Sequence, residues 1–341
     1  MKAFDEIFID KTKYGVKVQT SEYSELGEHI IIDQGQSQIA GYTDREEGVF
    51  EEVPVIVFGD HTRIIKYVDK PFFLGADGVK VLRSKDENAN YKYLYYALKN
   101  AKIPNTGYNR HFKWLKNIQI NYPAVEKQAE IVAILDKVSS VIRKREDELS
   151  VLDDLIKARF VEMFGSIHES TKYPYIAVKD LTDVISGGTP SRDRSEYWYN
   201  GTIPWVKTTE LQNNVIKNVD EYITESGLAD SSAKMVPIGT VLVAMYGQGK
   251  TRGMTAYLGI EASTNQACAC ILPSEKIDSM YMWKYFELSY DKLRSLAQGA
   301  GQPNLNGNMI KNFQVLVPPI ELQNEYVSFV NQIDKSKFSF P

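Results

Sequence analysis

The sequence predicts a mixed α/β fold of the α+β type, in which a long helix of coiled-coil character separates two globular domains. Three observations support this. The 341 residues leave room for about two domains. A segment near residue 115 is repeated near residue 310. The chain between Pro123 and Gly165 contains neither glycine nor proline. We therefore expect a pseudo-repeat in which each domain is followed by a helix.

The repeated segment reads WLKNIQINYPAVEKQAEIV in its first copy and MIKNFQVLVPPIELQNEYV in its second. A shift of 195 positions places Lys116 on Lys311 and Val132 on Val327, with eight identities in 17 positions. In each copy an apolar run meets a proline, which cannot continue a strand ladder and suits the start of a helix. Acidic and helix-forming residues follow, as is typical of a helix N-terminus. Each copy is therefore expected to run from a strand through proline into a helix.

After Pro123 the helical pattern continues to about Phe164, and apolar residues recur along it at heptad spacing. One seam holds Leu135, Ile142, Leu149, Ile156 and Met163, and a second holds Ile131, Val138 and Leu152. At 1.5 Å per residue this helix is about 60 Å long, which is too long for the interior of one small domain. We expect it to join two globular units.

These patterns divide the chain into four parts. Residues 1–122 form a first mixed domain, 123–165 the spacer helix, 172–318 a second mixed domain and 319–341 a shorter second helix. Both domains contain short β-prone runs, such as VPVIVF in the first and GTVLVAM in the second, and helical stretches come late in each. The two copies agree poorly in sequence through their first halves.

Composition excludes some classes of protein. The net charge of −4 and the pI of about 5.8 argue against a generally basic nucleic-acid coat, although a local patch can still bind DNA. The longest apolar runs fall far below the ~20 residues of a membrane span. The opening residues MKAFDEIFID do not resemble a signal peptide. We therefore expect a soluble, cytoplasmic protein.

Residues 241–253, VLVAMYGQGKTRG, resemble a phosphate-binding loop. Ala244 stands at the first position of the pattern, where glycine is usual, and Gly249, Lys250 and Thr251 close it. A true phosphate loop needs a helix directly after it. The following RGMTAYLGIEAS has no helical period, and no later strand ends in an acid suited to magnesium. A nucleotide-binding enzyme is therefore the minor alternative.

The internal repeat gives this loop a second interpretation. It aligns with VIVFGDHTRIIKY, so that Thr251 and Arg252 fall on Thr62 and Arg63. The two copies share a hydrophobic strand and a tip that carries cations and hydrogen-bonding groups. Such a tip suits contacts to DNA phosphates and base edges, whereas an ordinary solvated hairpin is the simpler alternative.

Other glycine-containing loops carry amide, hydroxyl, aromatic or cationic side chains of the same kind, although turns use such residues in any protein. The candidate DNA-contacting residues are Gln34, Gln36, Tyr42, His61, Thr62, Arg63, Asn109, Arg110, Thr189, Lys207, Thr208, Gln248, Lys250, Arg252, Gln302 and Asn304.

The sequence contains no recognisable catalytic constellation. The four histidines lack metal-ligand spacing, and neither GxSxG nor HExxH occurs. Asp60 beside His61 resembles half of an acid-base pair, but the second copy has no such pair at the aligned positions. A binding or structural role for Asp60 is therefore favoured, and we expect no catalytic or metal-binding residue.

With these residues in view, the chain resembles the specificity subunits of type I restriction-modification systems over essentially its whole length. The carriers of the resemblance are DLTDVISGGTPSRDRSEYWYNGTIPWVKTTEL, FGDHTR with PFFLGADGVKVL, and the repeated segments NYPAVEKQAEIVAILDKV and VPPIELQNEYVSFVNQID. The resemblance implies two target-recognition domains, each reading one half of a split DNA sequence. It also implies that long helices, packed as an antiparallel coiled coil, set the spacing between the halves.

The resemblance further implies partners rather than chemistry in this chain. Two methyltransferase subunits that use S-adenosylmethionine would dock on the helices, and motor-nuclease subunits that use ATP and Mg²⁺ would join them, in the cytoplasm of a bacterium or archaeon. The chain itself would bind none of these cofactors. The DNA half-sites and the spacer length do not follow from the residues.

The second helix is shorter than is usual in this family. We therefore expect the apolar seam at Leu149, Leu152 and Ile156 to lack an intramolecular partner. A methyltransferase subunit, a second copy of the chain or a separately encoded fragment would then cover it. The candidate subunit-docking residues on the helix are Leu135, Ile142, Leu149, Leu152 and Ile156.

Overall fold

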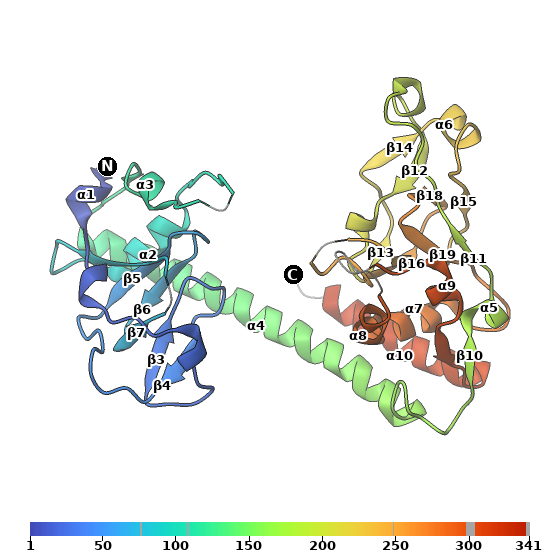
Figure 1. Cartoon of the computed structure of the whole chain (residues 1–341), viewed down its shortest axis with the longest axis horizontal. Helices are drawn as coiled ribbons and strands as arrows, with labels where there is room; N and C mark the ends of the chain where they lie inside the picture. The colour runs from blue at the N-terminus through green and yellow to red at the C-terminus, as the bar shows by residue number, and fades with distance from the viewer. Residues whose placement is uncertain (76, 108, 248, 298–303, 339–341) are drawn as a thin grey trace. The chain divides into compact units, whose positions relative to one another are not determined.

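A computed structural model describes residues 1–338 except 76, 108, 248 and 298–303. The chain divides into two compact units, unit 1 over Met1–Arg145 and unit 2 over Glu146–Pro341. Helix α4 (Val125–Phe164) spans 40 residues and contributes to both units (Figure 1). The expected mixed α/β fold with a long helix between two sheet-rich domains is confirmed.

Unit 1 contains three small sheets. Their strand orders are β2-β8-β5-β6, β4-β3-β7 and β1-β9. The elements are β1 (Lys2–Ala3), α1 (Phe4–Ile7), β2 (Phe8–Asp10), η1 (Thr12–Tyr14), η2 (Thr20–Glu22), β3 (His29–Ile32), β4 (Gly41–Thr43), β5 (Val55–Gly59), β6 (Ile65–Val68), β7 (Phe72–Leu74), β8 (Val79–Ser84), α2 (Tyr91–Lys99), α3 (Phe112–Leu115) and β9 (Gln119–Ile120).

Unit 2 also contains three sheets, with the orders β11-β19-β16-β17-β13, β14-β12-β18-β15 and β10-β20. The elements are β10 (Tyr175–Ala177), α5 (Val178–Leu181), β11 (Val184–Ser186), η3 (Ser195–Tyr197), β12 (Ile203–Val206), η4 (Thr208–Glu210), β13 (Asn214–Ile216), β14 (Glu221–Ile223), α6 (Glu225–Ala229), β15 (Met235–Val236), β16 (Val241–Ala244), β17 (Thr255–Leu258), β18 (Ala262–Thr264), β19 (Cys268–Ile271), α7 (Ser279–Leu288), α8 (Tyr290–Ser295), α9 (Gly307–Lys311), β20 (Gln314–Leu316) and α10 (Ile320–Phe338).

The two units repeat one topology. The order β2-β8-β5-β6 corresponds to β11-β19-β16-β17, and β4-β3-β7 corresponds to β14-β12-β18. In both units the second sheet contains a parallel pair, β3 with β7 and β12 with β18. The strand on the other side of β3 or β12, which is β4 or β14, is antiparallel. The repeat therefore covers whole domains, including the first halves in which the sequences agree poorly.

The repeated proline segment has the same hydrogen bond from glutamine to proline in both copies. The Gln128 side chain donates to the carbonyl of Pro123 at 2.9 Å, and Gln323 donates to Pro318 at 2.7 Å. Both amide side chains are buried, so each needs a hydrogen-bond partner inside the protein. This requirement explains why glutamine and proline recur five residues apart.

Each unit has its own hydrophobic core. In unit 1 one cluster joins β5 and β8 to α1, α2 and α3 through Phe4, Phe58, Leu82, Leu94 and Leu115. In unit 2 the largest cluster joins the second half of α4 to α7, α10 and the sheet. Its central aromatic residues are Phe160, Phe164, Tyr281, Tyr285 and Tyr326, all essentially buried.

The second half of α4 has a partner within unit 2, contrary to our expectation. Arg159 forms an ion pair with Glu325 at 2.7 Å, and Asp153 forms one with Lys337 at 2.7 Å. Because the α10 positions rise as the α4 positions fall, the two helices run antiparallel. Ile156 is only 5% exposed in this core, so the expectation that it lacks an intramolecular partner is wrong.

The other expected docking residues differ in exposure. Leu135, Leu149 and Leu152 are half-buried, and Ile142 is 53% exposed. Three further apolar residues of the first half of α4, Ile134, Val138 and Val141, are also exposed.

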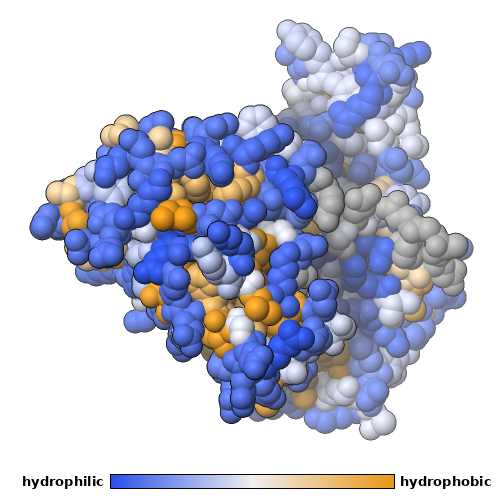
Figure 2. Space-filling view, turned by 60° about the vertical axis from the view of Figure 1, so that its left-hand side comes forward, coloured by the Kyte–Doolittle hydropathy of each residue, from blue (hydrophilic) through white to orange (hydrophobic). Residues whose placement is uncertain are grey.

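The described helices include none that combines the length and the apolar character needed to cross a membrane. Figure 2 displays one face of the molecule, where hydrophilic residues predominate and hydrophobic residues form separate patches.

Candidate nucleic-acid interface

In unit 1 three loops meet at the β5–β6 turn. The Gln34 side chain, which follows β3, accepts from the His61 amide at 3.1 Å and donates to the carbonyl of Asp77 at 2.9 Å. The Thr62 hydroxyl donates to the carbonyl of Gln34 at 2.7 Å. A side chain at Gly59 would overlap Thr62 and Gln34, so glycine is needed at this close approach. The Gln34 amide therefore holds the loops together.

A fourth loop, residues 103–111, is tied to the same turn. Asp60 is 3% exposed; its carbonyl accepts from the His111 amide and its carboxylate accepts from the Phe112 amide, both at 2.7 Å. The Arg63 guanidinium donates to the carbonyl of Ile103 at 3.3 Å. Asp60 thus anchors the start of α3, which supports a structural role.

The candidates of unit 1 occupy different places in this loop cluster. Thr62, Asn109 and Arg110 are exposed on its loops, and Gln36 is exposed on the loop after β3. Tyr42 lies instead within β4, opposite Ile30, and takes no part in the bonds that join the loops.

Arg63 has φ +63°, in the left-handed region that non-glycine residues rarely adopt. Its amide donates to the carbonyl of Gly59 at 2.7 Å, which closes the tight turn. The sequence signal for this turn was weak because a β-hairpin usually places glycine, asparagine or aspartate at such a position.

In unit 2 the corresponding loops also meet. The amide of Met245, directly after β16, donates to Ala267 at 2.8 Å, and its carbonyl accepts from Leu305 at 3.0 Å. Asn265 donates to the carbonyl of Val206 at 3.0 Å. The Thr189 hydroxyl bonds to the Gln266 side chain. These contacts join the loops that follow β11, β12, β16 and β18 and the segment before α9.

Helix α8 fixes the β16–β17 loop. The Arg294 guanidinium donates to the carbonyls of Gly249 and Arg252, each at 2.9 Å. The Tyr290 hydroxyl donates to the carbonyl of Lys250 at 2.7 Å. The main chain of the loop is therefore held, while the Lys250 side chain is exposed and that of Arg252 is half-buried. Neither Arg294 nor Tyr290 was predicted from the sequence, because they lie about 40 residues beyond the loop.

Lys207 is already engaged within unit 2. Its ammonium lies 2.8 Å from a Glu221 carboxylate oxygen and 3.6 Å from Asp220. The hydrogen bond to Glu221 raises the pKa of Lys207. A DNA phosphate would therefore have to compete with two carboxylates for this lysine.

The remaining candidates of unit 2 are less constrained. Thr208 begins η4 and is half-buried. The side-chain oxygen of Asn304 is buried and has no hydrogen-bond partner among the residues that the structure describes. Gln248 and Gln302 lie outside the described residues.

The structure gives no support to a phosphate loop at residues 244–251. The next element is strand β17, which pairs with β16 as a hairpin, where a phosphate loop would need a helix. Within the described part of the chain, no cluster of three histidine, cysteine or acidic residues could hold a metal ion.

Two loop clusters on equivalent sheets define a duplicated recognition scaffold. Over residues 11–151 and 170–340 the sequence matches the family described as type I restriction modification DNA specificity domain, and the chain belongs to this family. It is the specificity subunit of a type I restriction-modification system.

Two relatives and a solved structure are similar to this chain over different shares of its length. The chain is 26% identical to the EcoR124I/EcoR124II specificity subunit of Escherichia coli, covering 95% of this chain and 83% of that one. It is 28% identical to the MjaIX specificity subunit of Methanocaldococcus jannaschii, over 46% of this chain and 37% of that one. The fold is similar to that of the S subunit from M. genitalium, with a TM-score of 0.56, 16% identity and coverage of 98% and 89%.

Proposed function

We propose that each unit reads one half of a split DNA sequence through the loop cluster described above. The observation that carries this proposal is the equivalence of the β5–β6 and β16–β17 hairpins. They occupy equivalent places in the corresponding sheets of the two units, and both have main chains fixed by internal bonds. Fixed main chains leave the exposed side chains to make contacts at low entropic cost.

The exposed side chains suit two kinds of DNA contact. Lys250 and Arg110 carry cations that can reach phosphates, and Asn109, whose amide nitrogen donates to the carbonyl of Thr106, carries a side-chain oxygen that can accept from a base edge. Phosphate contacts are local, so they are compatible with the net charge of −4. Under this proposal Gln34 and Lys207 serve mainly to support the loops, because their polar groups are bonded within their units.

We further propose that this chain is a non-catalytic adaptor within the complex. Two methyltransferase subunits would bring S-adenosylmethionine, and motor-nuclease subunits would bring ATP and Mg²⁺, while this chain binds none of them. The helices would set the distance between the two half-sites. The exposed face of α4 is the surface that remains for a docking subunit.

The central test compares Lys250→Ala with Lys217→Ala in the complex assembled with methyltransferase subunits. Sequencing the methylated bases of a host with and without this chain first supplies the split DNA site. Lys250→Ala should weaken binding roughly tenfold and lower the salt slope by about one, as loss of one phosphate contact does. Lys217 follows the far end of β13 and serves as the matched control.

The same assay separates the two half-sites. Arg110→Ala should change binding to the half read by unit 1 and leave the other half unaffected. Unchanged DNA binding in both variants would contradict the proposed loops. If sequencing of the methylated bases found no motif that depends on this chain, the proposed function itself would be contradicted.

A further inference from the structure

A buried lysine of strand β6 holds the loop that follows β3. The Lys66 ammonium donates to the carbonyl of Ser37 at 2.6 Å and lies 3.4 Å from a carboxylate oxygen of Asp33. Its side chain is 3% exposed, whereas that of Asp33 is 28% exposed. One cation thus holds both ends of the segment 33–37, and Gln36, which is exposed, lies between them.

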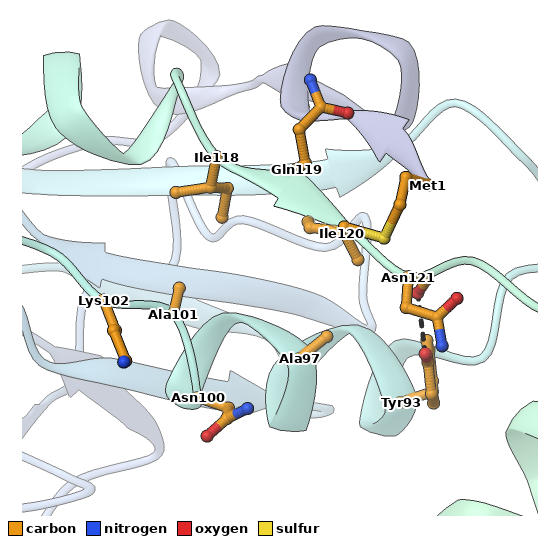
Figure 3. Close-up of a pocket in the computed structure, with 10 residues that line it drawn as sticks. All are labelled: Met1, Tyr93, Ala97, Asn100, Ala101, Lys102, Ile118, Gln119, Ile120 and Asn121. Atoms are coloured by element: carbon orange, nitrogen blue, oxygen red, sulfur yellow. Dashed lines mark hydrogen bonds between the residues drawn. The ribbon is translucent and has the colours of Figure 1, made fainter.

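Lys66 lies on the inner face of its sheet, away from α2. Ile56 and Phe58 of β5 face α2, and on that side a cavity of about 580 Å³ lies between α2 and β9 (Figure 3). Val57 points to the opposite face, in the core cluster that also contains Leu74 of the second sheet. Val57 pairs with Lys66, and directly paired strand residues share a face. The lysine is therefore on the side where the two larger sheets of unit 1 meet.

The equivalent position in unit 2 is apolar. The amides of Asp60 and Met245 donate to equivalent carbonyls just before β8 and β19, and counting back from them places Ala256 at the position of Lys66. Ala256 is fully buried in the core of unit 2. A buried ammonium loses its hydration, and burial accordingly lowers the pKa of Lys66. The strand pairing therefore does not require a lysine, and the contacts of Lys66 with the loop have to offset its loss of hydration.

Unit 2 ties its corresponding loop to the hairpin with neutral groups. The loop after β12 ends at Asn213, whose side-chain oxygen accepts from the amide of Thr255 at 3.2 Å and from its hydroxyl at 3.0 Å. The first residue after β3 is Asp33, whereas the first residue after β12 is Lys207, so the charge there is opposite in the two units. The connection between loop and hairpin strand thus recurs, while its chemistry is particular to each unit.

We propose that Lys66 is a positioning residue for DNA recognition, which holds residues 33–37 in the conformation that presents Gln36 to the half-site read by unit 1. This inference rests on the proposed function of the loops. Lys66 itself acts from inside the protein, because the loop encloses its ammonium. The amide of Gln36 can pair with an adenine edge, so its orientation decides which base it accepts. A buried ionic contact can fix one conformation without adding stability.

The test uses the chain assembled with methyltransferase subunits and DNA duplexes that carry the split site. Sequencing of methylated bases supplies this site, and a set of duplexes then changes one base pair at a time in each half. Gln36→Ala identifies the base pairs that Gln36 reads. Lys66→Met should lower discrimination at the same base pairs roughly tenfold, and discrimination in the half read by unit 2 should stay constant.

Three further variants distinguish positioning from a general structural role. The double variant Gln36→Ala/Lys66→Met should discriminate no worse than Gln36→Ala alone, because Lys66 acts through Gln36. Lys66→Arg keeps a cation near both oxygens and should recover part of the discrimination. Lys70→Met, at an exposed position beyond the far end of β6, removes the same charge and should have no effect.

Stability and half-site discrimination together decide the outcome. The urea midpoint of Lys66→Met should stay close to that of the unchanged chain, because Ser37 is exposed and Asp33 half-buried, so that water can replace the lysine. If Lys66→Met unfolds unit 1, Asp33→Asn should show the loss at the same base pairs instead.

The proposal and the proposed function fail in different ways. Discrimination that stays intact in the Lys66 and Asp33 variants, while Arg110→Ala alters binding to the unit 1 half, would overturn the positioning role alone. Equal losses in both halves, or additive losses in the double variant, would also overturn it. If Arg110→Ala has no effect either, the proposed function of the loops fails with it.

Discussion

The β5–β6 and β16–β17 hairpins begin from equivalent strands, yet different parts of the protein hold their loops. In unit 1 the tight turn is fixed to Gln34, on the loop after β3, through the His61 amide and the Thr62 hydroxyl. In unit 2 the longer loop is fixed by Arg294 and Tyr290 of α8, a helix without a counterpart in the described residues of unit 1. The sheet topology that the two units share sets the position of each loop, and contacts specific to each unit set its conformation.

The largest expected effect concerns the pair of helices α4 and α10 in unit 2. Phe160→Ala removes a fully buried ring that contacts Tyr326 and Tyr281, so the free energy of unfolding of unit 2 should fall by about 3–5 kcal/mol. Denaturant-induced unfolding, monitored by hydrogen exchange in each unit, measures this free energy. Val161→Ala, next to it but 45% exposed, should cost less than about 1 kcal/mol. Equal losses in both variants would mean that α10 does not cover α4 as described.

A smaller effect should distinguish the local stability of the β16–β17 loop from that of the β5–β6 turn. Arg294→Ala removes charge-assisted bonds to Gly249 and Arg252, and the free energy of local opening should fall by about 1.5–3 kcal/mol. Amide exchange in residues 249–254 should then accelerate roughly 10- to 100-fold, while exchange near Thr62 in unit 1 stays constant. Lys292→Ala, at an exposed position of the same helix, is the control. Unchanged exchange in Arg294→Ala would show that α8 does not hold the loop.

The smallest effect concerns the contact of α2 with α4 in unit 1. Hydrogen bonds from Lys92 and Tyr96 lower the pKa of Asp136. A lowered folded-state pKa gives stabilisation that is full above the unfolded value and is lost as the pH falls through the folded value. Asp136→Asn should therefore cost about 0.5–1 kcal/mol at pH 7 and progressively less as the pH falls below the ordinary value of 3.8 towards pH ~2. Urea unfolding at both pH values measures this, and a difference that persists in acid would argue against the ionic contact.

Local signals in the sequence predicted much of the fold. The absence of glycine and proline after Pro123 predicted α4, and the shift of 195 predicted the repeated strand, proline and helix. Both rest on residues close together in the chain. The burial of Ile156 was not predictable in this way, because α10 begins more than 160 residues later.

The loops were the least predictable part for the same reason. Composition placed Gln34 and Lys207 among the candidate DNA contacts, whereas the structure shows their polar groups bonded to Asp77 and Glu221. Both partners lie on other elements, and turn chemistry gives no sign of them. The role of Asp60 as an anchor for α3 likewise depends on a segment some 50 residues away.

The buried glutamines have a consequence for how such a chain can change over time. Gln128 and Gln323 each fasten the start of a helix to the proline carbonyl five residues earlier, and Gln323 also accepts from the Asp278 amide of its own unit. A gene cut and rejoined at this point would preserve the direction in which the helix leaves its domain. The proline junctions are therefore natural boundaries for exchanging one domain for another, with the recognition loops inherited as a block.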